Sequence, residues 1–162
     1  MALVTAVVAA TLIGGALYLS GQGDDDTPSA SAVDYRAELL TARRAASYPV
    51  LAPQGLPDSW KATSVRFNGE YFDAWHLGFQ APDGEYVAVE QSTQKPATFI
   101  EEASQGGEET KTTEEIGGRT WTRYSGGRYD ALVHQADSAT TVVAGTGSYA
   151  QLTQMAKALK DS

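Results

Sequence analysis

The chain has 162 residues, no cysteine, two histidines and a formal net charge of −8. This length suits one domain of ordinary size plus a short extra segment. Residues 48–162 carry nine basic and fifteen acidic side chains, a surface that would repel nucleic acid and anionic lipid head groups. The composition therefore excludes nucleic-acid binding, and without cysteine the sequence offers no disulfide and no lipid-modified cysteine.

An apolar segment opens the chain. Residues 1–23 contain no charged side chain, and a helix over residues 2–19 would be about 27 Å long, close to the hydrocarbon thickness of a bilayer. A cleaved signal peptide is the alternative, because Ala-Ser-Ala at 30–32 satisfies the cleavage rule, but this site lies far beyond the apolar run. A buried core helix fits least, since the segment has almost no polar stripe. We expect a transmembrane anchor at 1–20.

Acidic and small residues follow the anchor, and basic residues come only later. We therefore expect the C-terminal part to lie outside the cytoplasm. Residues 21–33 are rich in Gly, Asp, Ser and Pro, which is typical of a flexible tether. Residues 34–47 predict an amphipathic helix with Asp34 as its N-cap, either packed on the domain or resting near the membrane surface.

The globular domain is expected over residues 48–162, with a first strand at 60–68 and a hairpin at 74–92. Pro82, Asp83 and Gly84 supply the hairpin turn. If Ala81 pairs with Glu85, alternate side chains share one apolar face. These side chains are Trp75, Leu77, Phe79, Val87 and Val89.

The remaining elements are predicted from proline and glycine residues at their ends and from the spacing of apolar residues. A short helix is expected after Pro96 and ends at Gly106–Gly107, residues 108–115 look like an exposed loop or an edge strand, and three antiparallel strands follow up to Gly145. Residues 148–162 predict a closing helix with a Ser148/Gln151 capping box. Its buried stripe would be Tyr149, Leu152, Met155, Ala156 and Leu159. The fold class is therefore α+β: an N-terminal transmembrane helix plus an antiparallel sheet of about five to six strands packed with helices.

Signals for chemistry are few. His76 and Glu90 face each other across the hairpin, which we interpret as a polar pair on an exposed sheet face, because no nucleophile motif stands beside them. The Gly-Thr-Gly step at 145–147 lacks the rest of a phosphate-binding fingerprint. Asp24–Asp26 lack EF-hand spacing, and two histidines make zinc improbable. We predict no catalytic residue, no cofactor and no metal site.

Several short sequences together indicate a family. They are Leu-Pro-x-x-Trp at 56–60, Trp-His-Leu-Gly at 75–78, Glu-Gln-Ser at 90–92, and Gly118 with Trp121. With these short sequences in this order after one anchor, the chain resembles an actinobacterial family of single-pass envelope proteins that share a domain of unknown function. The layout is also similar to the outer domains of some membrane-anchored anti-sigma factors, which implies a sensor or binding role rather than catalysis.

Three functions remain open at this point. The first is a membrane-anchored, non-enzymatic accessory or binding domain that associates with another envelope protein, for example in an actinobacterial respiratory assembly. The second is a domain that binds an apolar envelope ligand such as a lipid. The third is a hydrolase, which would require a cluster of serine, histidine and carboxylate side chains.

Overall fold

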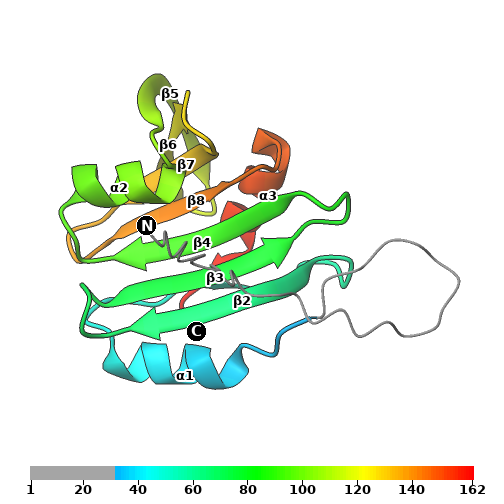
Figure 1. Cartoon of the computed structure of the whole chain (residues 1–162), viewed down its shortest axis with the longest axis vertical. Helices are drawn as coiled ribbons and strands as arrows, with labels where there is room; N and C mark the ends of the chain where they lie inside the picture. The colour runs from blue at the N-terminus through cyan, green and yellow to red at the C-terminus, as the bar shows by residue number, and fades with distance from the viewer. Residues whose placement is uncertain (1–31) are drawn as a thin grey trace, which may run out of the picture.

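The described part of the chain, residues 32–162, forms an α+β fold in the computed structural model (Figure 1). Its elements are α1 (Arg36–Ala45), β1 (Ala52–Pro53), β2 (Lys61–Asn68), β3 (Ala74–Gln80), β4 (Tyr86–Ser92), α2 (Pro96–Ser104), β5 (Glu108–Ile116), β6 (Arg119–Ser125), β7 (Asp130–Gln135), β8 (Thr140–Gly145), α3 (Tyr149–Ala158) and β9 (Leu159–Lys160). No helix within this range is both long and apolar enough to span a membrane. The predicted anchor at 2–19 lies outside the described residues.

One antiparallel sheet organises the fold. Its seven strands follow the order β2-β3-β4-β8-β7-β6-β5, and β1 and β9 form a separate two-stranded sheet. Helix α3 and the small sheet pack on one face of the large sheet, which we call the inner face. Helix α2 packs on the other, outer face over β7 and β8, and α1 lies beside the edge strand β2 (Figure 1).

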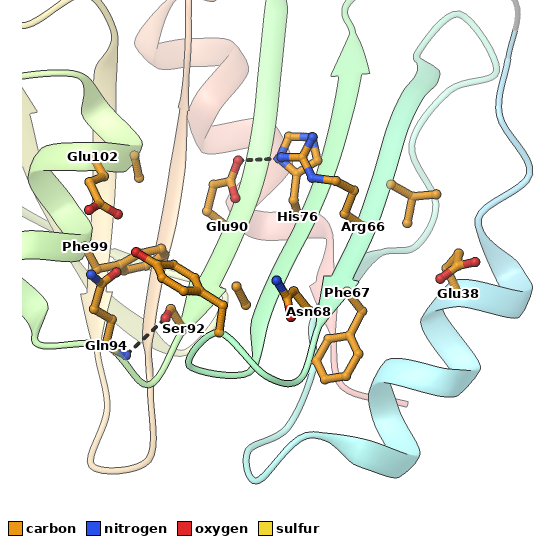
Figure 2. Close-up of a pocket in the computed structure, with 14 residues that line it drawn as sticks. Glu38, Arg66, Phe67, Asn68, His76, Glu90, Ser92, Gln94, Phe99 and Glu102 are labelled. Carbon is orange, nitrogen blue, oxygen red and sulfur yellow. Dashed lines mark hydrogen bonds and ion pairs between the residues drawn. The ribbon is translucent and has the colours of Figure 1, made fainter.

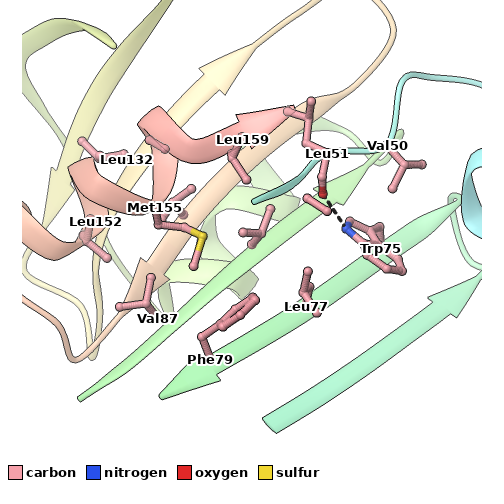
Figure 3. Close-up of a cluster of buried hydrophobic side chains, with 14 of the residues drawn as sticks. Val50, Leu51, Trp75, Leu77, Phe79, Val87, Leu132, Leu152, Met155 and Leu159 are labelled. Carbon is pink, nitrogen blue, oxygen red and sulfur yellow. Dashed lines mark hydrogen bonds between the residues drawn. The ribbon is translucent and has the colours of Figure 1, made fainter. Parts of the chain in front are cut away.

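The β3–β4 hairpin has the predicted register. Phe79 lies opposite Val87, and Leu77 lies opposite Val89. Because successive side chains of a strand point to opposite faces, this register places five apolar side chains on the inner face. All five are buried in one core cluster with side chains of α3 and of the segment before β2: Trp75, Leu77, Phe79, Val87 and Val89. Figure 3 labels all of them except Val89.

The irregular segment before β2 closes over this core through hydrogen bonds to the hairpin. The indole Nε1 of Trp75 donates to Leu51 O at 3.0 Å (Figure 3). The buried amide of Gln91 accepts from Leu51 N at 2.8 Å and donates to Pro49 O and to Thr141 Oγ1. A buried polar group is tolerated when its hydrogen-bonding capacity is used, so Gln91 fixes the segment without an orphaned donor.

The prediction of about five to six strands is too low by at least one. Residues 108–116 are the edge strand β5 rather than an exposed loop. The strand carries four glutamates and one lysine, and its pairing shifts register between Glu109 and Thr113. Both features protect this free edge against pairing with other chains.

Three details of the predicted helices are corrected or decided. Asp34 is not the N-cap of α1: it accepts from Arg36 N at 3.1 Å, and the cap position is Tyr35. The same helix packs on the domain, with Ala42 buried in the core. The C-terminal helix has the predicted capping box but ends at Ala158, because Leu159 and Lys160 extend to pair with Pro53 and Ala52.

Trp75→Ala should lower the free energy of unfolding by about 3–5 kcal/mol, because the substitution empties a fully buried site and orphans the Leu51 carbonyl. Chemical denaturation of both proteins measures the difference. Exposed Thr112→Ala on β5 is the control and should change stability by less than about 0.5 kcal/mol. Equal stabilities for the two variants would contradict the packing described above.

Candidate functional site

A groove lies where α2 leaves the outer sheet face open. This groove has a volume of about 680 Å³. Phe99, Glu102 and Ala103 of α2 form one wall, while His76 and Glu90 of the hairpin form the floor (Figure 2). The other wall contains β2 and Glu38 of α1, so the groove crosses three neighbouring strands.

Three polar side chains, one from each of these strands, form a hydrogen-bonded row beside the groove. Ser64 Oγ of β2 lies 2.7 Å from His76 Nε2 of β3. His76 Nδ1 in turn bonds Glu90 Oε1 of β4 (Figure 2). Because a carboxylate only accepts, Nδ1–H donates to Glu90, and in the neutral imidazole Nε2 accepts from the Ser64 hydroxyl.

The backbone of β2 and β3 makes room for this row. The β2–β3 pairing shifts register between Ala62 and Ser64, which places Ser64 opposite Gly78 on the outer face. A Cβ at Gly78 would collide with Ser64 Oγ and come within 3.1 Å of the Tyr86 hydroxyl. Glycine is therefore required here by the close approach of two side chains.

The predicted His76/Glu90 pairing is confirmed, but its predicted exposure is wrong. The two residues are register partners on the outer face. His76 is only 8% exposed, and Glu90 is half-buried. The pair therefore belongs to a buried network rather than to a solvated surface, and its loss should cost more than that of an exposed ion pair.

Arg66 joins this groove to a second hollow. It is the register partner of His76, and its side chain extends toward the imidazole (Figure 2). Arg66, His76, Glu90, Glu102 and Ala103 line both the groove and an adjoining hollow of about 240 Å³. The two hollows therefore form one continuous surface with a guanidinium at their junction.

Tyr86 lines the second hollow and stays protonated over a wide pH range. Burial, followed by the negative charge of Glu90, raises the pKa of the Tyr86 phenol to about 12. A neutral phenol can donate a hydrogen bond, and Ser64 is its partner here.

Serine, histidine and carboxylate in this order are the side chains of a nucleophilic relay, in which histidine takes the hydroxyl proton. The structure therefore contains the cluster of serine, histidine and carboxylate side chains that a hydrolase would require. Ser64 is, however, not among the residues that line either hollow. The row instead holds His76 through both ring nitrogens and fixes the groove floor.

The other sequence candidates have structural roles. His134 lies opposite Thr141, and its Nδ1 is 2.9 Å from Thr120 O. Gly145 and Gly147 pack on β4, where a Cβ at Gly145 would collide with the Tyr86 carbonyl. Within residues 32–162, no three His, Cys, Asp or Glu side chains are grouped to hold a metal ion. Asp24–Asp26 lie outside the described residues.

Sequence reasoning missed Ser64 and Arg66. Both lie on a strand that the sequence predicts, but their contact with His76 depends on the β2–β3 register. That register follows from a loop over residues 69–73 and from the shift at Ala62/Ser64, and neither has a short turn signature like that of Pro82–Gly84. Gly78, opposite Ser64, was the available signal, because a glycine inside a strand marks a close approach.

Comparison with known proteins identifies the family. A family model described as "Protein of unknown function (DUF4245)" matches residues 1–159. The chain belongs to this family. The match confirms the resemblance to a family of unknown function and covers nearly the whole sequence. No curated protein and no solved structure matches the DUF4245 chain.

His76→Gln should lower the free energy of unfolding by about 1–3 kcal/mol, because glutamine cannot keep both bonds and leaves a buried polar group without a partner. Thermal and urea denaturation measure this change. His134→Gln is the matched control and should cost less, because His134 is more exposed and has one such bond.

A fluorophosphonate probe, which labels activated serine side chains, tests whether Ser64 is a nucleophile. We expect no labelling of Ser64, since it lies outside the groove lining. Labelling of the native protein that disappears in both Ser64→Ala and His76→Gln would show an activated serine and overturn the structural interpretation of the row.

Tyr86→Phe should reduce the loss of stability at alkaline pH. The pKa of Tyr86 in the folded protein is about 12 against an ordinary 10.0. Stability from the neutral phenol is complete below pH 10.0 and is lost as pH rises toward 12, because the unfolded chain releases its proton first. Unfolding free energies measured at pH 9 and pH 11, on the order of one unit either side of the ordinary pKa, should differ less in the variant. An unchanged difference would contradict the burial of this hydroxyl.

Proposed function

We propose that this DUF4245 protein is a membrane-anchored, non-enzymatic domain outside the cytoplasm that associates with another protein of the envelope or of a membrane complex. An actinobacterial respiratory assembly is one candidate host. Residues 2–19 would hold the protein in the membrane, residues 21–33 would tether the domain, and the domain itself would supply the binding surface.

One observation carries the binding role: a groove of about 680 Å³ has a floor whose polar groups already bond one another. Both ring nitrogens of His76 are occupied, and Ser64 lies beside the groove rather than in it. Such a floor is rigid and offers fixed contacts instead of a reacting group. The groove volume is also within the usual range of ligand sites, about 300–1,000 Å³.

The apolar part of the groove supports the second candidate, an apolar envelope ligand such as a lipid. Phe67, Tyr71 and Phe99 all line it. A groove open to solvent buries an apolar chain less completely than a closed cavity does, so we rank this candidate second. Organic extraction of the purified full chain, followed by mass spectrometry, distinguishes it: a stoichiometric lipid that is lost in Ala103→Trp favours the ligand over the partner.

The full chain should remain in the membrane fraction after high-salt and alkaline washes, while a protein that starts at Val33 should be soluble. The apolar run at 2–19 is long enough to account for this difference. Leu12→Arg with Ile13→Arg is the control: two charges within the run should weaken retention, because each costs about 2.5–3.5 kcal/mol near a bilayer centre. Soluble behaviour of the intact full chain would contradict the anchor.

A native gel in mild detergent examines the association itself. The anchored protein should migrate in an assembly larger than one chain and its micelle. Migration as a single chain, at detergent concentrations that preserve other membrane complexes, would contradict the proposed partner.

A further inference from the structure

Two adjacent aromatic residues project from the loop between β2 and β3. Tyr71 and Phe72 are each 48% exposed, and their rings meet edge to face with centroids 5.0 Å apart. Within residues 32–162, Leu40 is the one other large hydrophobic side chain that is exposed. Isolated exposed apolar residues are common, but a contacting pair on a single loop is a concentrated apolar surface. We call Tyr71 and Phe72 the aromatic tip.

The backbone of the aromatic tip adopts a conformation that its residues disfavour. Phe72 has φ 52° and Asp73 has φ 48°, in the left-handed region. A bulky side chain rarely takes this region, and strain of this kind concentrates at functional sites. Glycine or asparagine would fill the same turn with less strain, so the turn alone does not explain a phenylalanine here.

Hydrogen bonds from two neighbouring segments hold this strained turn. The Phe72 carbonyl accepts from Thr93 N at 3.0 Å and from Ser92 Oγ at 3.1 Å, at the end of β4. On the other side, the Asp73 carboxylate accepts from Ser47 N at 3.1 Å and from Ser47 Oγ at 2.8 Å. The exposed rings are therefore presented from a fixed backbone, not from a loose loop.

The position of the aromatic tip relates it to the groove. Tyr71 also lines the groove, so the two surfaces are continuous. The described chain enters at the opposite end of β2, where Val33 N donates to Ala62 O at 2.8 Å. From Ala62 to Asn68 the strand advances about 20 Å, so the loop that carries the tip lies at the far end of β2 from the point of entry (Figure 1).

We infer that the aromatic tip is a preformed anchor that inserts into an apolar pocket with a basic rim on a partner protein. This inference rests on the proposed function. A rigid aromatic pair loses little conformational entropy on binding, which is the property of interface hot spots. Glu70 and Asp73 flank the pair in the chain, and residues 48–162 have a net charge of −6, so a basic rim complements the tip.

A lipid surface and a second copy of the chain fit these observations less well. A bilayer accepts aromatic side chains from a flexible loop and needs no fixed turn, and its anionic head groups would meet the Glu70 and Asp73 carboxylates. A second copy would bring the same acidic flanks into contact. Both occupants nevertheless give distinct products in the experiment below.

The experiment places a photo-cross-linking residue, p-benzoylphenylalanine, at position 72 of the full chain in its own membranes. We expect one adduct of defined mass, with the cross-linked peptide of the partner containing apolar residues beside Lys or Arg. The same probe at Leu40, which is 51% exposed on α1, is the matched control and should give no such adduct. A product with twice the mass of the chain, lipid adducts alone, or an equal adduct from Leu40 would overturn the inference.

Substitutions then examine the chemistry of the contact. With the probe at position 72, Tyr71→Ser should reduce the adduct at least fivefold and Glu70→Lys severalfold, while Glu115→Lys on the distant β5 should leave it unchanged. Separately, Phe72→Asn should keep or raise the Tm, because asparagine tolerates positive φ, and yet remove the protein from its assembly in the native gel.

The same gel separates failure of this inference from failure of the proposed function. An assembly that persists in Phe72→Asn and in Tyr71→Ser leaves the proposed function standing and contradicts the aromatic tip as its anchor. A native full chain that migrates alone contradicts both.

Discussion

The register of the β3–β4 hairpin is the constraint on which the rest of the structure depends. With Leu77 opposite Val89, the large apolar side chains of the hairpin lie in the inner core, and His76 and Glu90 face outward. A slip by one residue in either strand would exchange the two sets. The inner core and the outer groove are thus two consequences of one alignment, which the short turn at Pro82–Gly84 determines.

Buried polar side chains connect this hairpin to segments distant in sequence. On the inner face, Gln91 bonds the segment at 49–51 and the strand β8. On the outer face, His76 links β2 to β4 through Ser64 and Glu90. Within residues 32–162, no buried side-chain nitrogen or oxygen lacks a hydrogen-bond partner. These networks specify the arrangement as well as stabilise it, because any other packing would leave their members unpaired.

The sequence predicts those parts of the fold that depend on local patterns. Alternation and turn residues predict the hairpin, and the Ser148/Gln151 pair predicts the start of α3. Features that depend on distant partners escape this kind of reasoning. Leu159 continues a helical pattern in the sequence, yet it extends because Pro53, more than a hundred residues earlier, offers a strand. For the same reason the sequence predicted the His76/Glu90 pair, with no site there, and missed its neighbours Ser64 and Arg66.

The pairing of β1 with β9 joins residues near both ends of the domain, Ala52 with Lys160 and Pro53 with Leu159. Closing a loop of this length costs about 4 kcal/mol of chain entropy, which the pairing and the burial of Leu159 must offset. Because synthesis runs from the N-terminus, the segment around Leu51 has no closing strand until β9 has emerged from the ribosome. A nascent chain that still lacks β9 would therefore expose the Trp75 side of its sheet.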